Sequence, residues 1–125
     1  MKHGLIAMAL LLSGVPALAH HSFDAEYDAG KVTSLSGFVT KVDWQNPHAF
    51  VYVDVTDQGG AVKSYRVEMG PPYALVRGGW KKDTVKIGDK VTVEGAALAK
   101  DGSNAAGSMP TTMMVLSTGQ KLVMR

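Results

Sequence analysis

Three histidines carry the most specific chemistry that this sequence offers. His20 and His21 are adjacent, and they directly follow Ala17-Leu18-Ala19, the small-x-small pattern typical of a signal-peptidase site. Cleavage after this pattern gives His20 a free α-amine, which has a pKa of about 8 and readily loses its proton to a metal. An amine and neighbouring imidazoles form a nitrogen chelate that suits the tetragonal preference of Cu(II). We therefore predict a copper site at His20 and His21, with His48 as a third nitrogen ligand.

Each predicted ligand also has a plain structural interpretation. Adjacent histidines at a chain end are more commonly a solvated tail. His48 follows Asn46-Pro47 at the start of a predicted strand, where its ring can bond a loop carbonyl or stack on Trp44. Asn46 is typical of a turn, which its side-chain amide stabilises. Glu68 ends another predicted strand and is either a partner that orients a histidine or an exposed acid. Trp44, Asn46 and Glu68 are the candidate ligand-binding residues.

No residue set in the sequence is typical of ordinary hydrolytic catalysis. The chain has no cysteine, and no serine lies in the glycine frame of a nucleophile elbow. No glycine-rich phosphate loop precedes a helix, and no two carboxylates have a spacing that suggests an acid/base pair. We predict a binding protein and not an enzyme.

The methionines allow two interpretations. Thioethers are soft ligands that suit Cu(I), but methionine also fills gaps in hydrophobic cores. Met113 and Met114 are adjacent in a predicted strand, so their side chains point to opposite faces and cannot share one metal. Core packing is therefore the favoured interpretation of the methionines.

The first nineteen residues have the features of a secretory signal peptide. Lys2 precedes an apolar run over residues 4–12, which is shorter than the roughly 20 apolar residues that a membrane-spanning helix needs. We expect a soluble exported protein, periplasmic in a Gram-negative host and without membrane insertion after cleavage. The mature chain of 106 residues forms one domain, and its 12 basic and 11 acidic side chains argue against nucleic acid as a partner.

The mature chain has the element order of a small β-protein. Residues 20–33 are expected to form an extended arm, and residues 34–125 a barrel domain. Alternating apolar residues and turn signals predict three strands, a short helix and two or three further strands. Their predicted ranges are 34–44, 49–55, 62–69, 73–77 for the helix, 91–97, and a final hairpin at 113–116 and 121–124. This order predicts an OB-like Greek-key barrel, with an open antiparallel β-sandwich as the alternative.

The strand patterns also predict faces. In the first strand, Phe38, Val42 and Trp44 share one face, and Gly37 indicates a bulge or bend. Trp44 is expected to be largely buried at one end of the barrel. A further set of aromatic residues offers a stacking face for a small molecule or a saccharide, which makes an interaction module the alternative function, with residues 100–108 as its recognition loop. These aromatics are Phe38, Trp44, Phe50, Tyr52 and Tyr65.

Several short motifs occur in a specific order along the mature chain. They are His20-His21-Ser22-Phe23, Trp44-x-Asn46-Pro47-His48, Glu68-Met69-Gly70, Gly79-Trp80, Gly88-Asp89-x-Val91-x-Val93 and Ala99-Lys100-Asp101-Gly102-Ser103. In this combination the chain resembles a family of small exported bacterial proteins known only as a domain of unknown function. The resemblance implies export and a compact β-fold, but no activity.

Overall fold

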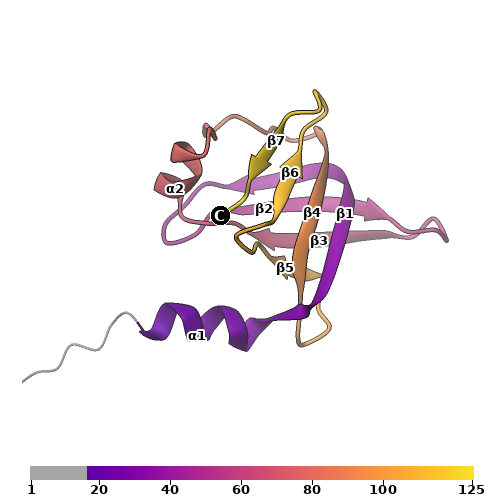
Figure 1. Cartoon of the computed structure of the whole chain (residues 1–125). Helices are drawn as coiled ribbons and strands as arrows, with labels where there is room; N and C mark the ends of the chain where they lie inside the picture. The colour runs from indigo at the N-terminus through magenta and orange to yellow at the C-terminus, as the bar shows by residue number, and fades with distance from the viewer. Residues whose placement is uncertain (1–16) are drawn as a thin grey trace, which may run out of the picture.

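The protein is mostly β, with one seven-stranded mixed sheet and two short helices (Figure 1). The computed structural model describes the backbone of residues 17–125 and the side chains of residues 22–125. The elements are α1 (Ala17–Glu26), β1 (Tyr27–Asp43), β2 (Phe50–Thr56), β3 (Val62–Glu68), α2 (Pro72–Arg77), β4 (Lys90–Ala99), β5 (Ala105–Gly107), β6 (Met113–Val115) and β7 (Lys121–Val123). Of the described residues, neither helix is long and apolar enough to cross a membrane.

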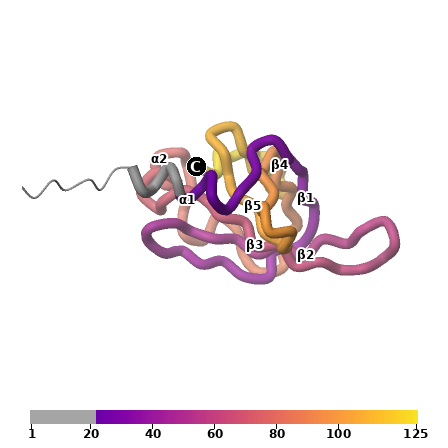
Figure 2. Tube along the Cα trace, turned by 90° about the horizontal axis from the view of Figure 1, so that it is seen from below, coloured from indigo at the N-terminus to yellow at the C-terminus, as the bar shows by residue number. Residues whose placement is uncertain are grey.

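Five strands of the sheet close into a ring of backbone hydrogen bonds. The long strand β1 pairs with β4 through its first part and with β2 through its last part. β2 pairs with β3, β3 with β5, and β5 with β4, which completes the ring. The β3–β5 pair is parallel and the others are antiparallel. Figure 2 shows the strands from below, with the β2–β3 hairpin projecting from the ring. Because all seven strands belong to one sheet, the predicted open sandwich is wrong.

The interior of the ring is filled by alternating apolar residues. Ala49, Val51 and Val53 of the second predicted strand are completely buried, as their period of two predicts. The buried apolar side chains of β1 are those of Tyr27, Leu35 and Val39, whereas Phe38 is 55% exposed. The predicted face for Phe38 is therefore wrong. The pairing of β1 with β2 slips between Val39 and Lys41, and a bulge there reverses the in–out alternation. Val42 and Trp44, which follow the bulge, pack against the core.

The chain between Tyr27 and Thr33 is extended but belongs to the sheet, whereas the residues before it are helical and not extended as predicted. Tyr27 pairs with Ala99, Thr33 pairs with Ala96, and Lys100 N donates to Glu26 O over 2.8 Å. These backbone bonds to β4 fix the segment. The predicted loop over residues 100–108 likewise contains a strand, β5, because Arg66–Glu68 bond it in parallel.

The methionine and tryptophan side chains complete the core. Met69, Met114 and Met124 are fully buried, which confirms their interpretation as core residues. Trp44 is less buried than predicted and packs against the edge of the core. The fully buried indole is that of Trp80, which is 2% exposed and whose Nε1 donates to Val123 O over 2.7 Å.

Candidate functional site

The centre of the candidate site is a pair formed by His48 and Glu68. His48 Nδ1 lies 3.0 Å from Glu68 Oε1. His48 lies two residues before Phe50, the first residue of β2, and Glu68 is the last residue of β3. Their strands run antiparallel, with Phe50 opposite Glu68 and Val51 opposite Val67, so that both side chains stand at the same end of the strand pair. The structure thus brings together two of the residues that the sequence singled out.

This contact has a direct chemical consequence for the imidazole. A neutral His48 that donates its Nδ1–H to the carboxylate keeps a free lone pair on Nε2. Its side chain is 37% exposed and that of Glu68 is 19% exposed, so the ring is accessible and the carboxylate is more sheltered. A carboxylate behind an imidazole is the arrangement that fixes the tautomer and orientation of metal-ligating histidines.

The pair forms one wall of a small pocket beneath α1. Ser22, Phe23 and Glu26 of the helix line it from one side, and Met69, Ser108 and Arg125 complete the lining. The cavity volume is about 50 Å³. One water needs roughly 10–15 Å³ of such a cavity, and pockets for organic ligands have about 300–1,000 Å³. The pocket therefore fits an ion with a few waters and is too small for an organic molecule.

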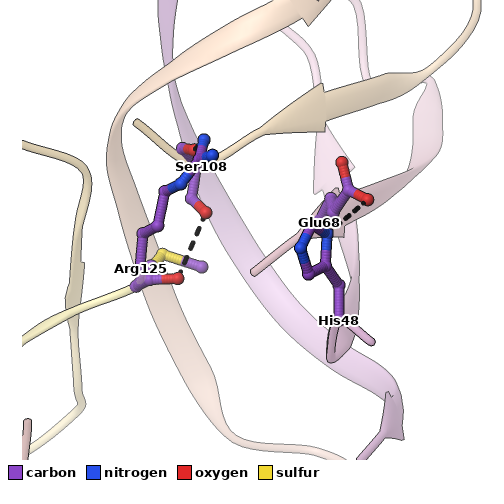
Figure 3. A network of polar contacts seen from close by, with 5 residues as sticks. His48, Glu68, Ser108 and Arg125 are labelled. Carbon is purple, nitrogen blue, oxygen red and sulfur yellow. Dashed lines mark hydrogen bonds and ion pairs between the residues drawn. The ribbon is translucent and has the colours of Figure 1, made fainter. Parts of the chain in front are cut away.

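A second network holds the opposite wall (Figure 3). Arg125 Nη1 donates to Ser108 O over 3.0 Å, and its guanidinium lies 5.0 Å from the centre of the Phe23 ring. Ser108 N donates to Glu68 O over 2.9 Å, and its hydroxyl donates to Met124 O over 3.1 Å. Arg125 thus connects the helix to the end of β5. The charged side chains that line the pocket are the carboxylates of Glu26 and Glu68 and the guanidinium of Arg125.

His20 and His21 have side chains outside the described residues. Their backbone belongs to α1, where they stand two and one positions before Ser22, which lines the pocket. Consecutive Cα atoms are 3.8 Å apart. The backbone of His20 and His21 therefore lies close to the pocket that Ser22 and His48 line. Within residues 22–125, no group of three histidine, aspartate or glutamate side chains is arranged to hold a metal.

Tyr27 is a buried residue that packs against Phe23 of the pocket lining without lining the pocket itself. It is 2% exposed, its hydroxyl is buried, and no residue of the described chain makes a hydrogen bond to that hydroxyl. Burial, and then the Glu68 carboxylate, raises the pKa of the Tyr27 hydroxyl above its ordinary range. The ring contacts Phe23, with centroids 5.1 Å apart. The available signal was their spacing of four residues, which places two aromatic rings on one side of a helix end.

The other predicted ligand residues lie elsewhere. Asn46 is exposed in the turn between β1 and β2, and neither it nor Trp44 lines the His48 pocket. The predicted aromatic face is divided. The Phe50 and Tyr52 rings are covered by the cations of Arg66 at 4.8 Å and Lys41 at 5.2 Å. The remaining three aromatics do not form a continuous patch, since Trp44 and Tyr65 pack against the core and Phe38 is exposed.

A larger and more open pocket is lined by Tyr27 and shares Glu26 with the His48 pocket. Its volume is about 450 Å³, within the range for small organic ligands. Arg66, Lys100 and Asp101 contribute charges to its lining, and Ala99 and Ala105 leave space between them. The predicted recognition loop over residues 100–108 therefore forms part of a pocket.

Comparison with known protein families identifies a match over most of the chain. The model of a family of unknown function, DUF6152, matches residues 8–108. No curated protein and no solved structure matches the chain significantly.

Proposed function

The chain belongs to DUF6152, a family of unknown function, and on that premise we propose that it is an exported copper-binding protein. In this proposal the signal peptide ends at Ala19 and the mature protein works in the periplasm or outside the cell. The α-amine and imidazole of His20, the imidazole of His21 and Nε2 of His48 hold the metal. We further propose that the five-stranded ring is an OB-type barrel, because a short helix separates its third and fourth strands.

The observation that carries the proposal is the 3.0 Å contact between His48 Nδ1 and Glu68 Oε1. An isolated accessible neutral histidine exchanges between its two tautomers in water. Here the carboxylate favours the Nδ1–H form, which leaves Nε2 as the basic nitrogen. The same pocket is lined by Ser22, which follows the two histidines directly. In the proposal, the segment before Ser22 and the residue His48 supply nitrogen donors from two separate parts of the chain.

Charge and size favour a metal ion over other ligands for this pocket. Glu26 and Glu68 outnumber the single cation of Arg125, so the lining compensates part of the charge of a divalent metal. Nitrogen donors from one amine and up to three imidazoles suit Cu(II), which prefers a tetragonal arrangement of such ligands. The small volume of about 50 Å³ leaves no space for an organic substrate. The proposed role is therefore binding, not catalysis.

The second candidate function is an interaction module that uses the larger pocket. It is favoured by the volume of about 450 Å³ and by the cationic side chains of Arg66 and Lys100 at its rim. A protein with this function leaves copper unbound and binds a small molecule or a partner protein over β5 and the preceding loop. In this alternative, adding the small molecule or partner protein changes the chemical shifts of residues around Ala105 and leaves those of His48 unchanged.

We expect Glu68→Gln to weaken Cu(II) binding by about 10–100-fold, the range found when the outer partner of a ligating histidine is removed. The amide offers His48 a weaker, neutral acceptor and leaves all proposed ligands in place. His48→Ala, which removes a ligand itself, should weaken binding at least as much. Isothermal titration of the protein with its native N-terminus measures both effects.

Glu94→Gln is the matched control for this titration. Glu94 is another partly buried strand glutamate, and its only ion pair is with Lys121 at 3.4 Å, counting the described part of the chain. Its variant should bind copper as the wild type does. Equal losses in Glu68→Gln and Glu94→Gln would mean that general surface charge, not the His48 pair, governs binding.

A further inference from the structure

Side chains of opposite charge line the larger pocket without pairing with one another. The pocket has a volume of about 450 Å³ and lies between the end of α1, the end of β4 and the start of β5. Arg66 and Lys100 bring positive charge to its lining, and Glu26 and Asp101 bring negative charge. Within the described residues, no ion pair joins any two of these four side chains. The lining therefore presents charges of both signs to a molecule that enters.

Backbone hydrogen bonds fix the segments that carry these charges. Lys100 N donates to Glu26 O over 2.8 Å, which joins the end of α1 to the residue after β4. Arg66 N donates to Asn104 O over 3.0 Å, which joins β3 to the loop before β5. Figure 1 shows this loop near the junction of α1 and β1. The pocket is thus formed without a ligand, and binding does not have to order these segments.

The Arg66 guanidinium and the Asp101 carboxylate are both available to a ligand. The guanidinium lies 4.8 Å from the centre of the Phe50 ring and makes no hydrogen bond to the described residues. Its planar set of N–H donors is therefore free to take a carboxylate. Asp101 Oδ1 accepts a hydrogen bond from Ser103 N over 2.9 Å. Hydrogen bonds from Ser103 lower the pKa of the Asp101 carboxyl, so that Asp101 is negatively charged at neutral pH.

The rest of the lining combines polar groups with a small apolar surface. The Lys100 ammonium donates to Asp24 O and keeps two further donors. Tyr27 also lines the pocket, and its buried hydroxyl has no hydrogen-bond partner among the described residues, although a buried phenol usually finds one. Ala99 and Ala105 contribute short apolar side chains. This lining suits a ligand with charged ends and a short apolar body.

We propose that the larger pocket binds a small zwitterion that carries one ammonium and one carboxylate, such as an amino acid or a dipeptide. Arg66 holds the carboxylate, with Lys100 as the second cation, and Asp101 holds the ammonium. A ligand of a single sign would also meet like charges in this lining, which oppose binding, whereas a zwitterion satisfies both signs. The inference does not rest on the copper function, because Glu26 is the only residue that the two pockets share.

The test uses the dipeptide alanylalanine, which is added to the metal-free protein while amide chemical shifts are followed. Amides around Ala99 and Ala105 should shift with dipeptide concentration, and those around His48 should not, because His48 does not line this pocket. Free alanine, titrated in parallel, shows whether a single amino acid is long enough to reach both charges. The C-terminal amide of the dipeptide lacks the carboxylate, and its N-acetyl form lacks the ammonium. Each blocked form should bind about fivefold more weakly, the upper end for one exposed ion pair.

Two variants assign the charges to their partners. Arg66→Gln should weaken alanylalanine binding by about fivefold and leave binding of the C-terminal amide unchanged, because that ligand has no carboxylate to lose. Asp101→Asn should weaken alanylalanine binding to a similar extent and leave binding of the N-acetyl form unchanged. Arg77→Gln is the matched control. Arg77 is another exposed arginine beside an aromatic ring, that of Tyr73 at 5.7 Å, and it does not line this pocket.

Equal affinities for alanylalanine and its two blocked forms would overturn the inference, as would unchanged amide shifts at millimolar dipeptide. Equal losses in Arg66→Gln and Arg77→Gln would also overturn it, since they would show a general effect of surface charge. Neither Arg66 nor Asp101 lines the His48 pocket, so both variants should bind Cu(II) as the wild type does. A failure of dipeptide binding is therefore distinguishable from a failure of the copper function.

Discussion

Trp80→Ala is expected to lower the free energy of unfolding by about 3–5 kcal/mol, the range for truncating a fully buried aromatic. Trp80 has the largest of the completely enclosed side chains and is 2% exposed. The substitution leaves a cavity and removes the 2.7 Å bond from its indole Nε1 to Val123 O, which ties the segment after α2 to β7. Urea unfolding followed by far-ultraviolet circular dichroism measures the loss, since that signal does not depend on the indole itself.

Trp44→Ala provides the comparison for Trp80→Ala. Trp44 lies at the edge of the core and is only partly buried, so that water fills much of the space that the truncation leaves. Its loss should be clearly smaller than that of Trp80→Ala. Equal losses of unfolding free energy in the two variants would show that the Trp44 indole contributes as much to the core as the buried indole of Trp80.

Gly37→Ala is expected to lower the free energy of unfolding by about 3 kcal/mol or more, which is the upper end of overpacking effects. The added Cβ would lie 1.9 Å from Asp54 O and 2.7 Å from Asp54 C. Both atoms belong to the backbone of β2, so no side-chain rotation relieves the clash. Gly37 lies at the bend where β1 passes from β4 to β2, next to Phe38, which pairs with both. Forcing these strands apart opens the ring.

Gly59→Ala is the matched control for the glycine prediction. Gly59 is exposed in the β2–β3 turn, where an added Cβ would meet only Asp57 Oδ1, at 3.3 Å. Its loss should stay within about 1 kcal/mol, as for most surface substitutions. A comparable loss in the two variants would mean that the strand contact at Gly37 relaxes more easily than its geometry indicates.

The strand order was accessible from the sequence because half-buried strands carry a period of two that few other elements imitate. Alternation at Ala49, Val51 and Val53 gave both the strand and its inner face. The bulge after Val39 was not accessible, because it depends on how two strands are paired and not on the residues of either. Strand β5 was missed for a related reason: its alanines and glycine carry no strand signal, and only the neighbouring Arg66–Glu68 segment makes it a strand.

The residue types of the candidate site were predictable, and Glu68 as the partner of a histidine was one of two interpretations that the sequence left open. A histidine after Asn46-Pro47 and a glutamate at a strand end are visible as unusual residues. Their contact joins positions 20 residues apart, and it follows from the register of β2 and β3. The buried position of Tyr27 was not predictable, because its ring packs against Gly107, which is 80 residues further along the chain. Close packing against a glycine leaves no periodic trace in either segment.

The central claim is that copper binds at a new N-terminus formed at His20. It is tested most directly by comparing two proteins that differ in one added residue. One begins at His20, and the other carries a single extra methionine before it, which keeps every side chain and moves the α-amine away from the histidine. Titration with Cu(II) under identical conditions should show tight binding to the first and a loss of about 100-fold or more in the second, the equivalent of roughly 2.7 kcal/mol. Equal affinities in the two proteins, or weak binding in both, would contradict the claim.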